Sequence, residues 1–450
     1  MDLAEATGNL RLKTLHLTNS WHASSGGIGT FYRALFETAN RAGHRMSLVA
    51  PGAKTSVEEV GEFGRIYYIE APFAPLNHDY RIVLPHRYIL PGTALRRILT
   101  AEQPDLVEIA DKYATHYLAG LLRTRRLPGV RLRPTVVGMS HERMDENVAA
   151  YLSPTQGARI LCRFYMKWLY FPMFDHHITV SEHTAGELIE AARGHKIQRS
   201  IWVAPMGVDC ELFHPGRRNE SVRARLAALT GASPDATLVL YAGRLAPEKD
   251  VGLLIDAASL LDPALFRVVI AGGGMLLESL RRECERRGLA HVVFLGHVAD
   301  REKLADHYAN TDVFLHPNAR EPFGIAPLEA MASGLPLVAP AAGGVASYAD
   351  AANSWPVDAR RENLARALAE TVRAVRAWPE ESARRARAAR STAEEHRWPK
   401  VTEHYLRLYR YLHALTLGQR MDEVMTPRAY STPGDMLGRE LAQHIFPKMF

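Results

Sequence analysis

The sequence predicts an α/β protein made of two domains, each built on a parallel sheet. Its 450 residues exceed the size that a single hydrophobic core usually serves. Between residues 12 and 50, a strand, a glycine-rich loop, a helix and a second strand follow one another, as at the start of a parallel α/β sheet. The same alternation starts again after residue 215, without obvious repetition of sequence.

The first domain is expected to span residues 1–215. Its opening strand, Leu12–Leu17, leads into the loop Ser24–Gly29 and then into Phe31–Ala42, where apolar residues recur at helical spacing. The second strand runs over Arg45–Ala50 and ends at a Pro-Gly pair. Later apolar runs predict strands at Ile66–Glu70, Leu106–Ile109 and Thr135–Met139, and a closing strand at His176–Val180.

The second domain is expected to span residues 216–396. Its predicted strands are Leu238–Ala242, Phe266–Ala271, Val292–Leu295, Val313–His316 and Leu335–Ala339, with helices at Val251–Leu261 and Leu276–Arg287. The Ala/Arg/Glu-rich stretch Glu362–Glu395 predicts helices in a solvated outer layer. A further helix is expected over residues 397–417, and residues 418–450 receive no assignment.

Composition excludes several classes of protein. The three cysteines, Cys162, Cys210 and Cys284, are far apart, which argues against a disulfide framework or a zinc site and favours a reducing compartment. The N-terminus has no apolar leader and no run reaches about 20 apolar residues, so we expect neither secretion nor a membrane span. The net charge of +6 and the pI near 9.1 suit anionic partners.

The most informative stretch runs from Glu321 to Glu329, with the sequence Glu-Pro-Phe-Gly-Ile-Ala-Pro-Leu-Glu. It predicts a turn that leads into a short helix, with one carboxylate in the turn and one in the helix. Ionised carboxylates accept hydrogen bonds from hydroxyl groups. The N–H groups of Phe323, Gly324 and Ile325, at the helix start, favour a phosphate. Hydroxyls on both sides of a phosphate describe a nucleotide sugar.

Two further strand ends carry candidate ligand-binding residues. Arg244 and Lys249 lie five positions apart in the Pro-containing turn after Leu238–Ala242, where both can face one diphosphate. His141 directly follows the strand that ends at Met139. The pair Gly26-Gly27 allows close backbone approach to a phosphate or sugar. The third glycine of a dinucleotide-binding fingerprint is missing, which argues against that function.

These strings together resemble family 4 of the retaining glycosyltransferases. The segment from Glu321 to Glu329, continued by Ala-Met-Ala-x-Gly, is similar to the E-x7-E signature of that family, and the resemblance covers roughly residues 12–412. It implies a GT-B fold, in which two Rossmann-like domains face each other across a cleft, and a reaction without a metal ion or other cofactor. It also implies that the helix at 397–417 crosses back to the first domain.

The resemblance implies roles for the two basic residues, Arg244 and Lys249, which we call the clamp, and for the two carboxylates. Arg244 and Lys249 would hold the diphosphate, Glu321 would bind hydroxyls of the transferred sugar, and Glu329 would bind the ribose. His141 would contact the donor sugar and complete a catalytic set with Glu321, Arg244 and Lys249.

The resemblance also assigns residues outside that set. Gly26 and Gly27 would lie near the donor phosphate. Val298 and Asp300 would hold the nucleobase, although Asp300 is equally suited to cap the following helix. Two positions depart from the family pattern: Met206 stands where Asn is common, and Gly343-Gly-Val-Ala-Ser lacks a usual Glu. The chain has no Asp-x-Asp motif, which argues against the metal-dependent class of glycosyltransferases.

The expected activity is therefore transfer of a hexosyl group from a UDP- or GDP-sugar to a hydroxyl group of a lipid or saccharide. Alternatives are an epimerase or phosphorylase of the same fold, a Rossmann-type oxidoreductase, or an inactive binding module. We expect a cytoplasmic protein without a nucleic-acid partner. A basic cluster and the aromatic-basic stretch 159–174 suggest contact with the inner, anionic face of a membrane. The cluster comprises Arg123, Arg125, Arg126, Arg131 and Arg133.

Overall fold

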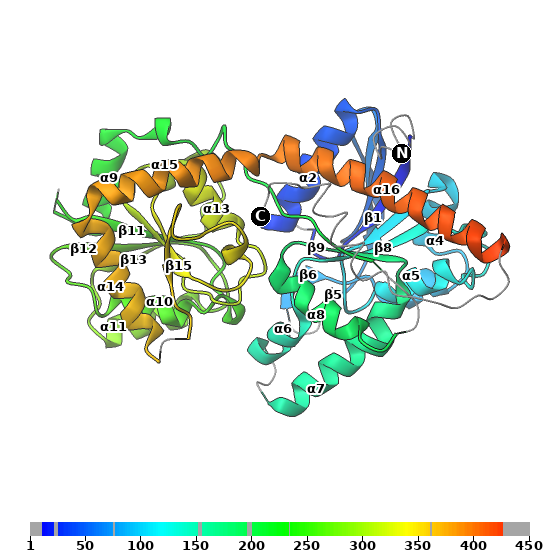
Figure 1. The fold of residues 1–450 in the computed structure, drawn as a ribbon, viewed down its shortest axis with the longest axis horizontal. Helices are drawn as coiled ribbons and strands as arrows, with labels where there is room; N and C mark the ends of the chain where they lie inside the picture. Colours follow the sequence, from blue (N-terminus) through cyan, green and yellow to red (C-terminus); the bar gives the residue numbers. More distant parts are fainter. Residues whose placement is uncertain are drawn as a thin grey trace. The chain divides into compact units, whose positions relative to one another are not determined.

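The computed structural model contains two compact units (Figure 1). It describes residues 11–21, 26–74, 77–151, 155–195, 200–233, 235–360 and 362–425. The first unit combines described residues of 11–145, 155–205 and 399–425, and the second combines 206–398 with 146–151. Most of the unassigned stretch 418–450 lies outside the described residues, since they end at 425.

The first unit contains an eight-stranded sheet with the order β10-β9-β8-β7-β1-β2-β4-β3. All neighbouring strands are parallel except β3 and β4. The strands are β1 (Lys13–Leu17), β2 (Arg45–Gly52), β3 (Ser56–Val60), β4 (Gly64–Glu70), β7 (Leu106–Ile109), β8 (Thr135–Ser140), β9 (His176–Thr179) and β10 (Ser200–Val203). Strands β7, β8 and β9 are buried along their whole length, as expected for central parallel strands covered by helices.

The helices of this part of the chain occupy connections between these strands, except α16, which returns to the first unit after the second unit. They are α2 (Gly27–Arg41), α3 (His86–Ile89), α4 (Ala94–Glu102), α5 (His116–Arg123), α6 (Met144–Tyr151), α7 (Gln156–Tyr165), α8 (Glu182–Ala192) and α16 (Trp398–Met425), and residues 146–151 of α6 cluster with the second unit. A π-helical turn η1 (Met166–Tyr170) and a 3₁₀ turn η2 (Phe171–Met173) follow α7, and β5 (Phe73–Ala74) pairs with β6 (Asn77–Arg81).

The second unit contains a six-stranded, fully parallel sheet with the order β13-β12-β11-β14-β15-β16. Its strands are β11 (Thr237–Ala242), β12 (Phe266–Ala271), β13 (Val292–Gly296), β14 (Val313–Leu315), β15 (Leu337–Pro340) and β16 (Trp355–Val357). Its helices are α9 (Glu220–Thr230), α10 (Val251–Ala258), α11 (Leu277–Arg286), α12 (Arg301–Ala309), α13 (Ile325–Ala332), α14 (Leu364–Ala377) and α15 (Pro379–Glu395). This strand order is that of the Rossmann fold, and the order reverses between β11 and β14.

The structure corrects several expectations about the sheets and helices. Strand β10 lies outside β9, so His176–Val180 does not close the first sheet. The antiparallel edge strand β3 and the short strand β16 were not expected, because neither has a long apolar run. Helix α14 is not a solvated outer layer, since Leu368 and Val372 are buried in the second core.

The boundary between the units falls at residues 205/206 and not near 215. Val208 pairs with Arg397 as an isolated parallel bridge, and Phe213 packs edge-on against Tyr308 with ring centroids 5.3 Å apart. Both contacts tie the segment after residue 205 to the second unit.

Helix α16 belongs to the first unit from Pro399 onward and reaches its central strand β7. Glu108 of β7 is fully buried, and His16 Nδ1 lies 2.9 Å from its Oε1. Tyr32 donates to Oε1 at 3.1 Å, and Tyr409 of α16 donates to Oε2 at 2.6 Å. Burial and the charge of Glu108 raise the pKa of both tyrosines well above the usual value, so both remain protonated donors. These bonds fix α16 to the sheet.

Candidate active site

The most densely charged group of predicted site residues lies where the order of the second sheet reverses. Strands β11 and β14 are neighbours, and the carboxyl ends of parallel strands meet at one edge of the sheet. The loop after β11 carries Arg244 and Lys249, and the loop after β14 carries Asn318 and Glu321. The topology therefore brings together a basic and an acidic motif that are far apart in the sequence.

Lys249 and Glu321 form a close ion pair at this edge. Lys249 Nζ donates to Glu321 Oε1 at 2.8 Å and to Oε2 at 2.9 Å, and Asn318 Nδ2 lies 3.3 Å from Oε2. Glu321 is 8% exposed. Burial alone would raise its pKa, but Lys249, His316 and the hydrogen bonds outweigh burial and lower the pKa below the usual value. Glu321 is therefore an ionised hydrogen-bond acceptor at neutral pH.

Two more cations lie in the same loops. Arg244 NH2 is 3.1 Å from Glu248 Oε1, and Arg320 NH2 donates to Asp250 Oδ1 at 2.7 Å. The side chain of Arg244 is about half exposed. The two basic residues of the predicted clamp are thus held by carboxylates, and a diphosphate would have to compete with Glu248 and Glu321 for them.

The backbone around Glu321 is shaped by glycines. Gly324 has φ +91°, and a Cβ there would lie 2.9 Å from both Tyr348 Oη and Val345 Cγ2. Gly344 N donates to Glu321 O at 2.6 Å, and a Cβ on Gly344 would lie 2.1 Å from Pro322 O. Only glycine fits at these positions. The loop that lacks the expected Glu after Gly344 therefore still packs directly on the Glu321 turn.

Helix α13 begins at Ile325, directly after this turn. The N–H groups of the first turn of a helix have no intrahelical acceptor, and Pro327 has no N–H to offer. The donors that α13 presents are therefore those of Ile325 and Ala326. Phe323 is 4% exposed and packs 5.1 Å from the Tyr348 ring, so its side chain serves the core and only its backbone can meet a ligand.

Glu329 lies inside α13 in a buried position. Tyr308 Oη donates to its Oε2 at 3.2 Å, and Arg301 NH2 lies 3.5 Å from its Oε1. Burial raises the pKa of Glu329 to about 7. Arg301 and the Tyr308 hydrogen bond favour the ionised form and offset part of the effect of burial. Near neutral pH this carboxyl group therefore changes its charge, unlike Glu321.

This raised pKa predicts how stability depends on pH. A carboxyl group whose pKa is raised on folding contributes stability below its unfolded value of 4.5, and this contribution is lost as pH rises through about 7. We expect Glu329→Gln to gain roughly 2–3 kcal/mol relative to the unaltered protein between pH 5 and pH 8. Urea unfolding of both proteins at several pH values measures the difference. A constant difference across this range would contradict the raised pKa.

Asp300 caps helix α12. Its Oδ1 accepts from Glu302 N at 2.9 Å and from Lys303 N at 3.3 Å, which is the N-cap arrangement. The predicted helix-capping role of Asp300 is therefore present in the structure. A contact between Asp300 and a nucleobase stays a prediction. Val298, in the same loop after β13, is half-buried and its contact with a base is likewise a prediction.

In the first unit, the predicted residues follow β1 and β8. Gly26 is the N-cap of α2, and a Cβ there would meet no described atom within 4 Å, so packing among the described residues does not require glycine. Gly27 is the first residue of α2. His141 directly follows β8, burial lowers its pKa, and its buried Nδ1 has no hydrogen-bond partner among the described residues. His141 is therefore neutral at pH 7.

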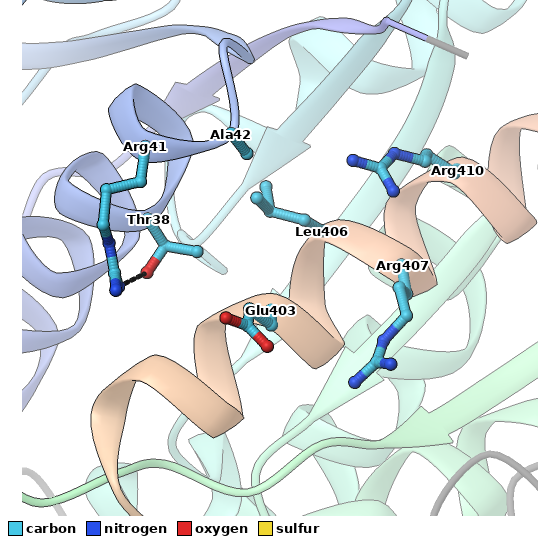
Figure 2. A pocket seen from close by; sticks show the side chains of 7 residues that line it. All are labelled: Thr38, Arg41, Ala42, Glu403, Leu406, Arg407 and Arg410. Carbon is cyan, nitrogen blue, oxygen red and sulfur yellow. Dashed lines mark hydrogen bonds between the residues drawn. The ribbon is translucent and has the colours of Figure 1, made fainter. Parts of the chain in front are cut away.

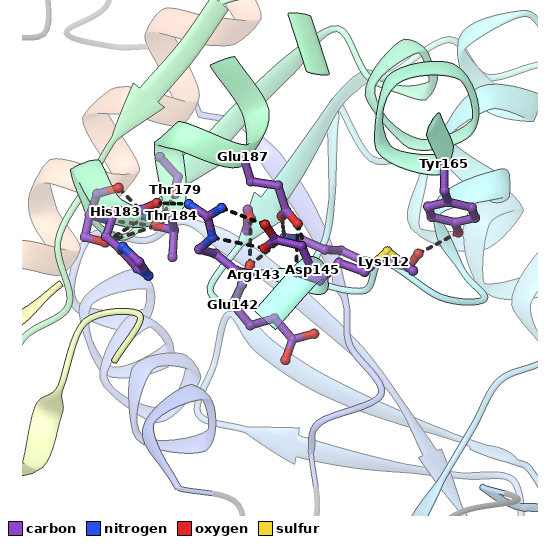
Figure 3. Close-up of polar contacts among 12 residues, drawn as sticks. Lys112, Glu142, Arg143, Asp145, Tyr165, Thr179, His183, Thr184 and Glu187 are labelled. Carbon is purple, nitrogen blue, oxygen red and sulfur yellow. Dashed lines mark hydrogen bonds and ion pairs between the residues drawn. The ribbon is translucent and has the colours of Figure 1, made fainter. Parts of the chain in front are cut away.

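A buried ion pair holds the loop that carries His141 (Figure 3). Lys112 Nζ lies 2.6 Å from Glu187 Oε2 and donates to the carbonyl oxygen of Glu142 at 2.5 Å. Glu187 Oε1 accepts from Met144 N at 2.8 Å and from Asp145 N at 3.1 Å, at the start of α6. Lys112 and Glu187 were not predicted. The one available signal is that Lys112 follows β7, at the same sheet edge as His141.

The histidines His176 and His177 have packing roles. His176 Nε2 lies 2.8 Å from Thr416 Oγ1, and His177 stacks on Phe171 with ring centroids 4.6 Å apart.

A hollow of about 320 Å³ lies between α2 and α16 (Figure 2). Its lining includes Arg41, Glu403, Arg407 and Arg410. It lies at the C-terminal end of α2, whereas Gly26 and Gly27 lie at the opposite end of the same helix. The hollow therefore contains none of the predicted site residues, and we assign it no role.

The structure thus assembles Arg244, Lys249 and Glu321 in one cluster and places Glu329 in the helix that follows. Sequence reasoning missed Asn318, His316, Tyr308 and Arg301, which support the two carboxylates. Burial lowers the pKa of His316 to about 4, so this neighbour of Glu321 is uncharged at neutral pH. Asn318 follows β14 at the expected sheet edge, and this position was the available signal.

Two family models match the chain. The one described as Glycosyltransferase Family 4 matches residues 25–212, and the one described as Glycosyl transferases group 1 matches residues 225–392. The chain is 30% identical over 392 residues to the GDP-mannose-dependent alpha-(1-6)-phosphatidylinositol dimannoside mannosyltransferase of Mycobacterium tuberculosis, covering 87% of this chain and 94% of that protein. It is 27% identical over 331 residues to the GDP-mannose-dependent alpha-mannosyltransferase of Corynebacterium glutamicum, covering 73% and 72%.

Solved structures share the fold at lower identity. Sucrose-phosphate synthase from Thermosynechococcus elongatus superposes with a TM-score of 0.72 at 20% identity, covering 90% of this chain and all of that one. Anabaena HepE in complex with UDP-glucose gives a TM-score of 0.62 at 19% identity, covering 91% of this chain and all of that one. These likenesses confirm the predicted fold class.

Proposed function

This chain belongs to the family 4 glycosyltransferases, and on that basis we propose that it moves a mannosyl group from GDP-mannose to a hydroxyl group of a membrane lipid. Its GT-B fold and its action as a nucleotide-sugar-dependent glycosyltransferase follow from the family. The names of two relatives specify GDP-mannose, and one of them acts on phosphatidylinositol dimannoside. These relatives support guanosine over uridine and a lipid over a free sugar as acceptor.

The Lys249–Glu321 ion pair is the observation that carries this proposal. A diphosphate bound between the loops after β11 and β14 would form ion pairs with Lys249 and Arg244, in place of their present carboxylate partners. Release of Lys249 would leave the Glu321 carboxylate with acceptor capacity for sugar hydroxyls. The N–H groups of Ile325 and Ala326, at the positive end of α13, would add hydrogen bonds to the phosphates. Glu329, next to Arg301, would accept from the ribose.

We propose that transfer retains the configuration at the anomeric carbon. The acceptor oxygen forms its bond to that carbon on the face from which the diphosphate departs, and the bond from carbon to phosphate oxygen breaks. The departing phosphate oxygen takes the acceptor proton, so no separate protein base is required. Arg244 and Lys249 neutralise the negative charge that grows on the leaving group. The neutral His141, whose Nδ1 has no partner among the described residues, would hydrogen-bond to the sugar.

Titration of nucleotides tests the division of labour between the two carboxylates. Glu329→Ala should weaken binding of GDP about tenfold or more, because the ribose belongs to donor and product alike. Glu321→Gln should leave GDP binding nearly unchanged but lower mannosyl transfer, because the free nucleotide has no sugar for it to contact. Calorimetry with GDP and with UDP measures both, and the unaltered protein should prefer GDP. The assignment fails if the Glu321 variant loses GDP affinity while the Glu329 variant keeps it.

We also propose that transfer requires no divalent metal ion. Arg244, Lys249 and Arg320 provide three positive side chains within the two loops that would surround the diphosphate. Transfer from GDP-mannose should therefore continue at a similar rate in excess EDTA. Complete loss of activity that magnesium or manganese restores would show that the cationic side chains do not suffice.

The proposed lipid acceptor places the reaction at a membrane surface. We propose peripheral association with the inner face of the cytoplasmic membrane, which the basic pI and the lipid-acting relative support. Transfer to acceptor lipid in vesicles should then exceed transfer to the same headgroup free in solution. Equal rates with both acceptors would favour a soluble saccharide.

A further inference from the structure

An apolar face of the first unit lies open to solvent. Helix α7 and the turn η1 present five large apolar side chains outward: Ile160 (58% exposed), Leu161 (67%), Phe164 (57%), Trp168 (52%) and Leu169 (40%). We call these five the α7 face. Ile160, Phe164 and Trp168 recur every four residues along one side of the segment, and Leu161 and Leu169 each lie next to one of them. Figure 1 shows α7 at the outer edge of the first unit, close to α8.

The opposite side of the same segment is anchored in the core. Cys162, Met166 and Tyr170 are buried, and Tyr165 Oη donates to Lys112 O at 2.7 Å. Both sides of the segment are therefore apolar, and only one side can be buried within the unit. A surface helix normally turns charged residues to solvent, so this outward face indicates a partner.

Basic residues are interleaved with the α7 face. Arg159 and Arg163 are exposed on α7, and Lys167 Nζ lies 5.4 Å from the centre of the Trp168 ring. Arg163 shares an exposed ion pair of 3.2 Å with Glu190. Aromatic and leucine side chains mixed with arginine and lysine are typical of a segment that lies in the headgroup layer of an anionic bilayer.

The separate arginine cluster at 123–133 contributes less than the sequence suggested. Arg123 Nε donates to Asp175 Oδ1 at 3.0 Å, and Arg133 NH1 donates to Oδ2 at 3.2 Å, so one largely covered carboxylate holds both. Across the part of the chain that the structure describes, no helix combines the length and apolarity needed to cross a bilayer. The α7 face is thus the stronger candidate for membrane contact.

We propose that the α7 face docks the protein on a bilayer that contains anionic lipids, with Phe164 and Trp168 inserted among the headgroups. A second copy of the chain fits this face less well, because a two-fold contact would bring the arginines and lysines of both copies together. This inference rests on the proposed function, because docking on a bilayer serves an enzyme whose acceptor is a membrane lipid. Binding to vesicles without donor or acceptor tests it independently of transfer.

Vesicle sedimentation tests the proposal with three proteins. The unaltered protein should bind vesicles of equal parts phosphatidylcholine and phosphatidylglycerol, bind weakly to phosphatidylcholine alone, and be released by salt. Phe164→Ser combined with Trp168→Ser should lower the partition coefficient about tenfold or more. The control combines Leu229→Ser with Met275→Ser, which are 61% and 66% exposed in the second unit, and should bind like the unaltered protein.

Each variant is first shown to bind GDP with unchanged affinity, which establishes that the second unit is folded. Circular dichroism and thermal unfolding then establish that the first unit is intact. Undiminished vesicle binding by the Phe164/Trp168 variant would overturn the proposal. So would a dimer of the unaltered protein in solution that the same variant converts to a monomer, since the α7 face would then be a contact between copies. Loss of vesicle binding with normal transfer to a soluble acceptor would support docking and refute a purely catalytic defect.

Discussion

Lys249→Ala is expected to lower mannosyl transfer by about 10²–10³-fold, equivalent to roughly 2.7–4 kcal/mol of transition-state stabilisation. The substitution removes a charge that would stabilise the leaving diphosphate. It also leaves Glu321 without the cation that now lies 2.8 Å from its carboxylate. Burial would then raise the pKa of Glu321, so that its ionised form becomes less populated near neutral pH. Turnover of GDP-mannose, measured beside thermal stability, gives the effect.

Lys303→Ala is the matched control for Lys249→Ala. It removes the same charge from an exposed position on α12 of the same unit, and it should leave transfer nearly unchanged. Arg244→Ala should resemble Lys249→Ala but with a smaller effect, because the Arg244 side chain is half exposed. If folded Lys249→Ala turns over at close to the normal rate, the clamp does not act on the leaving group.

Lys112→Met is expected to destabilise the first unit by about 3–5 kcal/mol. The variant leaves the Glu187 carboxylate, which is 6% exposed, without its partner at 2.6 Å. Glu187 would keep its bonds to Met144 N and Asp145 N, but these neutral donors do not replace a cation. Chemical denaturation at constant pH measures the loss.

A second substitution separates the cost of the unpaired charge from that of lost packing. Lys112→Met combined with Glu187→Gln removes both charges and keeps an acceptor for the two backbone N–H groups, so it should recover at least half of the lost stability. Arg286→Met breaks an exposed pair with Glu283 and should change stability little. A double variant as unstable as Lys112→Met would show that the unpaired charge is not the cause.

The elements of the site were predictable from the sequence, but their pairing was not. Arg244 and Lys249 were predicted from a loop after one strand, and Glu321 from a loop after another. The contact between Lys249 and Glu321 spans 72 positions and follows from the adjacency of β11 and β14, which no local pattern encodes. The same reason explains why Tyr308, which supports Glu329 from α12, was missed.

Strong apolar periodicity predicted the central strands, and its absence explains the elements that were missed. Strand β3, with the sequence Ser-Val-Glu-Glu-Val, lies at a sheet edge and needs little apolar content. Helix α14 was placed in the solvent because its arginines mask a stripe that includes Leu368 and Val372. The stretch 159–174 was predicted to contact a membrane, but the sequence could not tell which of its apolar residues face the core and which form the exposed α7 face.

The bond between Tyr409 and Glu108 has a consequence for folding during synthesis. Tyr409 comes 301 positions after Glu108, an interval that takes about 15–60 seconds to translate. Throughout this time the first unit lacks α16, and the central carboxylate has only His16 and Tyr32 as side-chain partners among the described residues. Nearly all of the second unit, residues 206–398, is synthesised meanwhile. The second domain can therefore be completed before the first, although it comes later in the sequence.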